Sequence, residues 1–164
     1  MWYSFFIIFL CVTIILGDVA FAITYGRFTM LLFHVSKCFM VGQYIDKINT
    51  LKYVFLANIF LIIFCIILFL LFFYSKKIKE MLRILLGLVI LGILVLNILT
   101  LRNTEDSKYP DFNIGILCPK YHNEYLSVIM IRKFMIVSSL YNCLKIMIIF
   151  FTCLRDVCFD NYYV

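Results

Sequence analysis

Two ionisable side chains and several amide and hydroxyl groups occur inside long apolar stretches of this sequence. Asp18 and Lys145 are the ionisable residues. Each costs about 2.5–3.5 kcal/mol at the centre of a membrane helix, so such residues normally face a partner or a cavity. We expect them to lie at one depth, in the outer half of a bilayer, together with five neutral residues: Asn58, Asn97, Ser138, Ser139 and Asn142.

This intramembrane polar layer has a functional and a structural interpretation. In the functional one, the layer surrounds the path of a small ion or a proton. In the structural one, its members form hydrogen bonds between helices and fix their packing, as Asn and Ser often do. We favour the structural interpretation, because four helices enclose little space for a pore. Its most specific form is an ion pair between Asp18 and Lys145.

The seven cysteines are an odd number, so disulfides cannot pair all of them. Cys38 and Cys118 lie in two long connections and form the natural disulfide if both connections face an oxidising compartment. If the connections face the cytosol, both residues are free thiols. Cys153 and Cys158 flank the end of the last apolar stretch and are candidates for palmitoylation. The others lie within apolar stretches and behave as small apolar residues: Cys11, Cys65 and Cys143.

Motifs for catalysis or for binding metals and phosphates are not found. His34 and His122 are the only histidines. Cys118 and His122 have a spacing that suits a metal, but no second pair completes a set of four ligands. The sequence also lacks G-x-S-x-G, H-E-x-x-H and a phosphate-binding glycine loop. We therefore expect no catalytic, cofactor-binding or metal-binding residues and no enzymatic activity.

Long apolar stretches must position these side chains. Of the 164 residues, 65% are hydrophobic, whereas soluble domains have about 45–50% apolar residues. Mean hydropathy is +1.06. A helix needs about 20 apolar residues to cross the hydrocarbon layer. Tyr25 and Tyr53 are expected at membrane interfaces, where aromatic residues are common. Four stretches are long enough to span: about residues 2–23, 53–74, 81–101 and 134–154.

These stretches predict an all-α membrane protein with a single transmembrane domain over residues 1–164. The short basic connection after residue 74 makes the second and third helices antiparallel, so we expect an antiparallel bundle of four transmembrane helices. Two longer loops, about 24–52 and 102–133, would lie on one face. The apolar residues 28–35 either extend the first helix or lie along the interface. The polar loop 102–133 contains both prolines and is expected to be irregular.

The basic residues give two conflicting indications of orientation. The dense cluster at residues 76–83 predicts a cytoplasmic turn, which would make both termini cytoplasmic. We weight this density and predict cytoplasmic termini, in either the plasma membrane or an endomembrane. The larger number of basic residues in the other two connections predicts the reverse orientation: Arg27, Lys37, Lys47, Lys52, Arg102, Lys108, Lys120, Arg132 and Lys133.

The first apolar stretch also has features of a cleaved signal peptide. Residues 5–17 precede Ala20-Phe21-Ala22, which fits the small-x-small cleavage pattern. No Lys or Arg precedes the stretch, however, and its apolar character continues past Ala22. We therefore predict that it is retained as a span. Cleavage would leave three spans.

The expected partners are the lipid bilayer and other membrane proteins or further copies of the chain. Nucleic acid is not expected, because the basic residues flank apolar runs and form no basic face on a soluble fold. A PDZ domain could bind the C-terminal Val164. The sequence predicts a non-enzymatic structural or partner-organising four-span protein. The alternative is a small transporter or channel subunit that uses the polar layer, with Asp18, Asn58, Asn97, Asn142 and Lys145.

Overall fold

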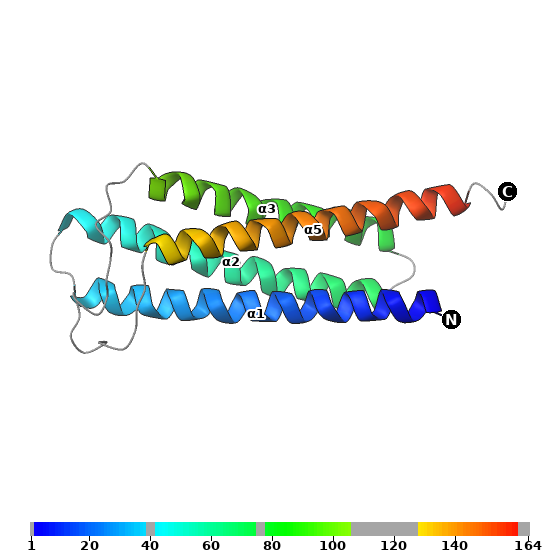
Figure 1. The fold of residues 1–164 in the computed structure, drawn as a ribbon, viewed down its shortest axis with the longest axis horizontal. Helices are drawn as coiled ribbons and strands as arrows, with labels where there is room; N and C mark the ends of the chain where they lie inside the picture. Colours follow the sequence, from blue (N-terminus) through cyan, green and yellow to red (C-terminus); the bar gives the residue numbers. More distant parts are fainter. Residues whose placement is uncertain (1, 39–41, 75–77, 106–127, 161–164) are drawn as a thin grey trace.

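The computed structural model describes residues 2–38, 42–74, 78–105 and 128–160 (Figure 1). The described chain is helical and contains the helices α1 (Trp2–Cys38), α2 (Gly42–Tyr74), α3 (Lys79–Glu105) and α5 (Val128–Asp160). Helices are the expected outcome for these sequences, because a backbone in lipid has no water to bond and must satisfy its polar groups internally.

All four helices are long and apolar enough to cross a membrane. The qualifying segments are Phe5–His34, Ile48–Leu71, Lys79–Arg102 and Ile129–Thr152. This confirms the predicted fold class, an all-α membrane protein with four transmembrane helices. The chain is therefore a multi-pass integral membrane protein.

Successive helices run in opposite directions (Figure 1). The first residues of α1 and the last residues of α5 lie at one end of the bundle, where the chain also passes from α2 to α3. The chain passes from α1 to α2 and from α3 to α5 at the opposite end. Contacts join α1 to α2, α2 to α3 and α3 to α5, and aromatic contacts such as Phe21–Phe134, with ring centroids 5.5 Å apart, connect α1 to α5. The predicted antiparallel bundle is confirmed.

The first connection is much shorter than predicted. The sequence-based boundaries assigned residues 24–52 to a connection, with residues 28–35 either extending the first helix or lying along the interface. The structure has the first of these alternatives, since α1 continues to Cys38, and α2 begins already at Gly42. The reason is packing, because apolar side chains on the extended parts bury one another: Phe28, Leu31 and Leu32 of α1 with Ile48, Leu51 and Phe55 of α2. At about 1.5 Å per residue, α1 is about 55 Å long. It therefore extends beyond a hydrocarbon layer of about 30 Å.

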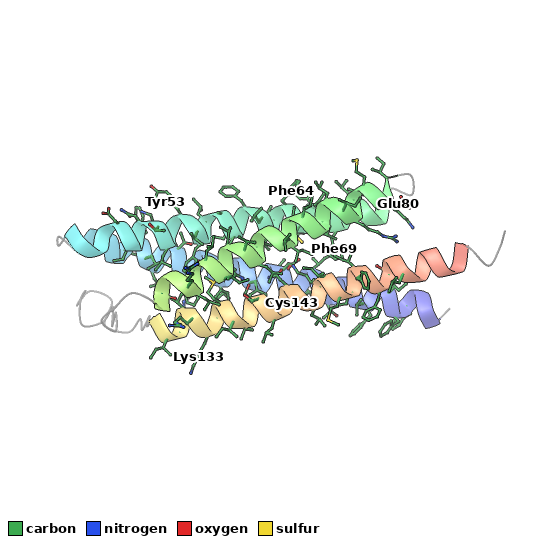
Figure 2. The ribbon with its side chains drawn as sticks, turned by 90° about the horizontal axis from the view of Figure 1, so that it is seen from above. Tyr53, Phe64, Phe69, Glu80, Lys133 and Cys143 are labelled. Carbon is green, nitrogen blue, oxygen red and sulfur yellow. The ribbon has the colours of Figure 1, made fainter. Side chains whose placement is uncertain are left out.

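The core of the bundle contains buried apolar residues from every helix, and the outer faces are also apolar. Phe64 of α2, Leu88 of α3 and Leu140 of α5 are exposed, and Figure 2 shows side chains of this kind projecting from the bundle. Such a surface is suited to contact with lipid, because the lipid chains around it are apolar as well. Some charged and amide side chains within the spans are the exception, because they are buried inside the bundle: Asp18, Asn58, Asn97, Asn142 and Lys145.

Candidate functional site

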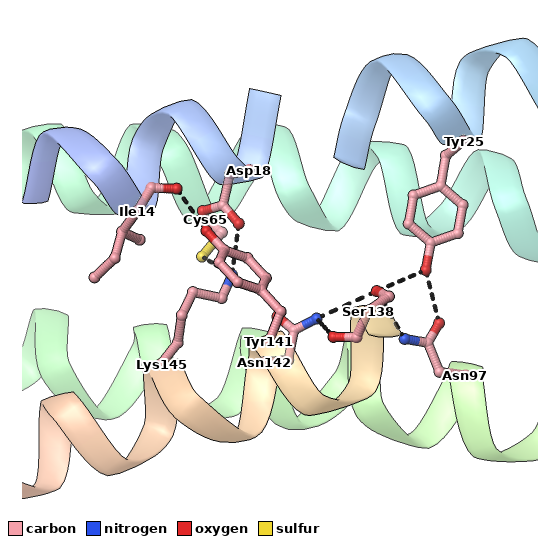
Figure 3. A network of polar contacts seen from close by, with 9 residues as sticks. All are labelled: Ile14, Asp18, Tyr25, Cys65, Asn97, Ser138, Tyr141, Asn142 and Lys145. Carbon is pink, nitrogen blue, oxygen red and sulfur yellow. Dashed lines mark hydrogen bonds and ion pairs between the residues drawn. The ribbon is translucent and has the colours of Figure 1, made fainter. Parts of the chain in front are cut away.

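Asp18 and Lys145 form an ion pair in the middle of the bundle (Figure 3). Lys145 Nζ lies 2.7 Å from Asp18 Oδ1, and each side chain is only 1% exposed. The same Nζ lies 3.8 Å from Cys65 Sγ and 4.9 Å from the centroid of the Tyr141 ring. Lys145 therefore stays in the core instead of extending outward to the interface. The ion pair joins α1 to α5, and Cys65 brings α2 to the same place.

Tyr141 brings α5 close to α1 beside the ion pair. Its hydroxyl donates a hydrogen bond to the backbone oxygen of Ile14 at 2.6 Å, and its ring stacks on Phe21 with centroids 4.8 Å apart. Gly17 makes this approach possible, because a Cβ at that position would lie 2.5 Å from the Tyr141 hydroxyl oxygen.

A second polar cluster joins all four helices, and its members are fully buried. The Tyr25 hydroxyl donates to Asn97 Oδ1 at 2.9 Å, and Asn97 Nδ2 donates to Ser138 Oγ at 3.1 Å. Tyr25 has a single hydroxyl proton, so the 3.0 Å contact between Tyr25 and Ser138 is donated by Ser138. These three residues form a closed ring of hydrogen bonds. Asn58 of α2 adds a bond from its Nδ2 to Asn97 Oδ1 at 3.3 Å.

The predicted single polar layer is thus two clusters at different levels. Tyr25 lies two helical turns from Asp18, a separation of about 10 Å along the helix. Asn142 lies between the clusters, and its Nδ2 donates to the Ser138 backbone oxygen at 2.8 Å. Ser139 takes no part in the network, since its hydroxyl donates to the Met135 backbone oxygen on its own helix at 2.8 Å.

Asp18 lies near the middle of the apolar segment Phe5–His34, and the expected position of the pair in the outer half of a bilayer stays a prediction. Arg27 lies about 14 Å from Asp18 along α1, toward the end where α1 passes to α2. In the other direction, the Asn97–Ser138 hydrogen bond sets the level of α3, and Lys79 then lies about 17 Å beyond the ion pair. Charged residues therefore bracket the pair at similar distances on both sides.

Three buried oxygen atoms of the network have no hydrogen-bond donor among the described residues. They are Asp18 Oδ2, Asn58 Oδ1 and Asn142 Oδ1. All three are acceptors. Buried acceptors of this kind are commonly satisfied by water held inside the protein. The network is therefore well connected between helices, but it retains the capacity to accept further hydrogen bonds.

Several predicted sites fall outside what the structure describes. Cys38 is the last residue of α1, but neither its side chain nor residue 118 is described, so the predicted disulfide remains a prediction. Cys153 and Cys158 belong to α5, with side chains outside the described set. The same holds for Val164, the predicted PDZ ligand.

Sequence reasoning missed three members of the clusters. Tyr25 was expected at an interface, yet it is fully buried, and Tyr141 and Cys65 were not assigned a polar role. A signal for them does exist. Residues seven apart lie on one face of a helix, and this spacing relates Tyr25 to Asp18 and Cys65 to Asn58. Tyr141 lies four residues before Lys145, which also places the two on one face.

The chemistry available at the network is pairing and hydrogen bonding between buried groups. Within the described ranges, the His, Cys, Asp and Glu side chains do not gather into a group of three that could hold a metal ion. Comparison of the chain with protein-family models, curated proteins and solved structures finds no match. The function is therefore inferred from this chain's own residues.

Proposed function

We propose that this multi-pass membrane protein is a non-enzymatic scaffold, whose bundle presents apolar outer faces to lipid and to other membrane proteins. One observation carries the proposal. Buried polar side chains from all four helices bond to one another across the bundle. Asp18, Asn97, Ser138 and Lys145 are each at most 1% exposed. Polar groups used in this way fix the relative positions of the helices.

Such a use is expected from the physics of helix association in lipid. Lipid chains are as apolar as Leu. Two apolar helices that come into contact within lipid therefore gain little free energy from the hydrophobic effect. Interhelical hydrogen bonds and close packing then decide which helices associate and in which register. A bundle held together from inside leaves its outer faces available for lateral contacts.

The absence of transport is tested with purified protein in sealed liposomes that contain an ion-sensitive dye. We expect the leak of K⁺, Na⁺ and protons to equal that of liposomes without protein. A flux that depends on the wild-type protein and disappears in Asp18→Asn would contradict the scaffold role. Circular dichroism of both samples shows whether the proteins are equally helical.

Lateral contacts are tested with a photo-activatable amino acid placed on the outer faces in native membranes. Suitable positions are Phe64, Leu88 and Leu140, one on each of three helices, and the buried Ile90 is the control. We expect protein adducts from at least one outer face and none from position 90. Lipid adducts alone at every outer position would contradict a partner-organising role.

The alternative function is a small transporter or channel subunit. It is favoured by the three unsatisfied acceptors Asp18 Oδ2, Asn58 Oδ1 and Asn142 Oδ1. Oxygen atoms are the ligands that hard cations prefer, and they also accept hydrogen bonds from water. Under this alternative, further copies or a partner would complete a path through the membrane. The liposome assay decides between the two functions where copies of this chain complete the path, since only the transporter or channel subunit predicts flux.

A further inference from the structure

An apolar groove lies on the outer surface between α3 and α5. It has a volume of about 230 Å³ and is lined by Arg83, Ile84, Gly87, Ile146, Ile149 and Phe150. Ile84 is 67% exposed and Phe150 is 59% exposed, so the groove opens away from the bundle. In a membrane this opening faces the lipid.

Gly87 leaves part of the groove open. A Cβ built at this residue would have nothing within 4 Å. The apolar atoms that line an empty space lack dispersion contacts on that side. Binding of an apolar chain that fits the groove is therefore favourable. The apolar chain present around every membrane protein is the acyl chain of a lipid.

The charge at one end of the groove selects the kind of lipid. Arg83 is half-buried in the groove wall and lies about 11 Å from the level of the Asp18–Lys145 pair, close to the edge of the hydrocarbon layer. Lys79 is one helical turn farther out and is exposed. Glu80 is exposed beside them, so two cations and one anion lie at this end among the described residues of α3.

A guanidinium group has five donors and matches a phosphate in a two-pronged geometry, so it binds phosphate in addition to other partners. A long basic side chain can extend toward the headgroups while its stem stays in the apolar layer. One phospholipid molecule therefore fits the groove, with an acyl chain against Gly87 and its phosphate at Arg83.

We propose that this groove is a binding site for one anionic phospholipid, with an acyl chain between α3 and α5 and the headgroup phosphate at Arg83. Lys79 adds a second positive charge that favours a headgroup with net negative charge. The site is independent of the scaffold role, because it would exist equally in a channel subunit.

The test is native mass spectrometry of the purified protein, which counts the lipids that stay bound. Phosphatidylserine and phosphatidylcholine of the same chain length are compared, for the wild type and for two variants with matched controls. Arg83→Gln is paired with Lys133→Gln, at an exposed residue of α5 near the other end. Gly87→Leu is paired with Gly26→Leu, since a Cβ at Gly26 also has nothing within 4 Å.

We expect the wild type to retain one phosphatidylserine in preference to phosphatidylcholine. Arg83→Gln should bind phosphatidylserine about tenfold more weakly, as expected for the loss of one charge-assisted contact. Gly87→Leu should lose retention of both lipids, because its side chain fills the groove. The two controls should behave as the wild type.

Equal retention of both lipids by the wild type would overturn the proposal, and so would equal effects of Arg83→Gln and Lys133→Gln. Unchanged binding by a folded Gly87→Leu would also overturn it. If Gly87→Leu does not fold, the comparison of the two charge variants remains decisive by itself. Helical content by circular dichroism identifies that case.

Discussion

The ammonium group of Lys145 is enclosed by the Asp18 carboxylate, the Cys65 sulfur and the face of the Tyr141 ring. A buried ion pair is weak evidence for stability, since well-packed apolar residues often serve as well. Removal of one partner is different, because it leaves a charge without compensation. We therefore expect the pair to contribute mainly to the choice of helix register. A slide of α5 along α1 by one helical turn, about 5.4 Å, would pull the two charges apart.

This reading predicts that Lys145→Leu and Asp18→Leu each destabilise the folded bundle. The expected loss is about 2.5–3.5 kcal/mol, comparable to the cost of one unpaired charge in a membrane helix. The double variant Asp18→Leu/Lys145→Leu should recover more than half of it. Folded yield and reversible unfolding in detergent measure the effect. Equal values for both single variants and the double variant would rule out the pairing.

Tyr25 should contribute through its hydroxyl group. Tyr25→Phe keeps the ring but removes the bonds to Asn97 and Ser138. We expect a loss of about 1 kcal/mol, which is typical for a hydrogen bond between membrane helices. Tyr53→Phe is the matched control, because Tyr53 is 65% exposed. Equal unfolding free energies for the two variants would show that the ring of hydrogen bonds adds nothing.

At the scale of the helices, the contact between α1 and α5 depends on the close approach of Tyr141 to Gly17. Tyr141 is held there by its bond to the Ile14 backbone oxygen and by its stacking on Phe21. A side chain at position 17 would have to displace a ring that is fixed at two points. The glycine therefore sets the distance between two helices that are far apart in the sequence.

We accordingly predict that Gly17→Ala is less stable than Gly26→Ala by about 1–3 kcal/mol, the usual cost of overpacking. Both changes gain the same helix propensity, so the difference isolates the steric effect. A Cβ at position 17 lies 2.5 Å from the Tyr141 hydroxyl oxygen, whereas one at position 26 has nothing within 4 Å. The measurement is thermal unfolding in detergent. Tyr141→Leu in the Gly17→Ala background should relieve the clash and reduce the difference.

At the scale of the whole molecule, the four antiparallel helices place both ends of the described chain on one side of the membrane. Glu80 lies at that end, and Lys133 lies at the opposite end (Figure 2). Basic residues occur at both ends, with Lys79 and Arg83 at one and Arg102 and Lys133 at the other. Counted over the sequence, the basic residues are more numerous in the other two connections, and their number predicts the reverse orientation. The dense cluster at residues 76–83 still favours a cytoplasmic position for both termini.

The orientation is testable with N-glycosylation, because the sequence contains no Asn-x-Ser/Thr acceptor of its own. We expect an acceptor introduced within residues 106–127 to be glycosylated in the endoplasmic reticulum, and one added after Val164 to remain unmodified. A shift in gel mobility that glycosidase reverses reports the modification. The opposite result would place the termini in the lumen. Glycosylation of both acceptors would contradict the antiparallel arrangement of four spans.

The sequence by itself determined that four helices cross the membrane. Each apolar stretch is long enough to span, and a single chain segment in lipid must satisfy its own backbone as a helix. It also identified Asp18 and Lys145 as residues that need a partner, because a lone charge in lipid is costly. Spanning length and the need of a buried charge for a partner are properties of a single helix, so the local sequence is sufficient to predict both.

Only the tertiary structure decided which side chains meet. Cys65 and Tyr141 lie beside the ion pair, while Tyr25 joins Asn97 and Ser138 two turns away. It also decided that α1 and α2 extend through most of the expected first loop, by burial of apolar residues on each helix against the other. Relative rotation, depth and distance between helices come from packing among all four. The position of a residue along its own helix does not specify these three quantities.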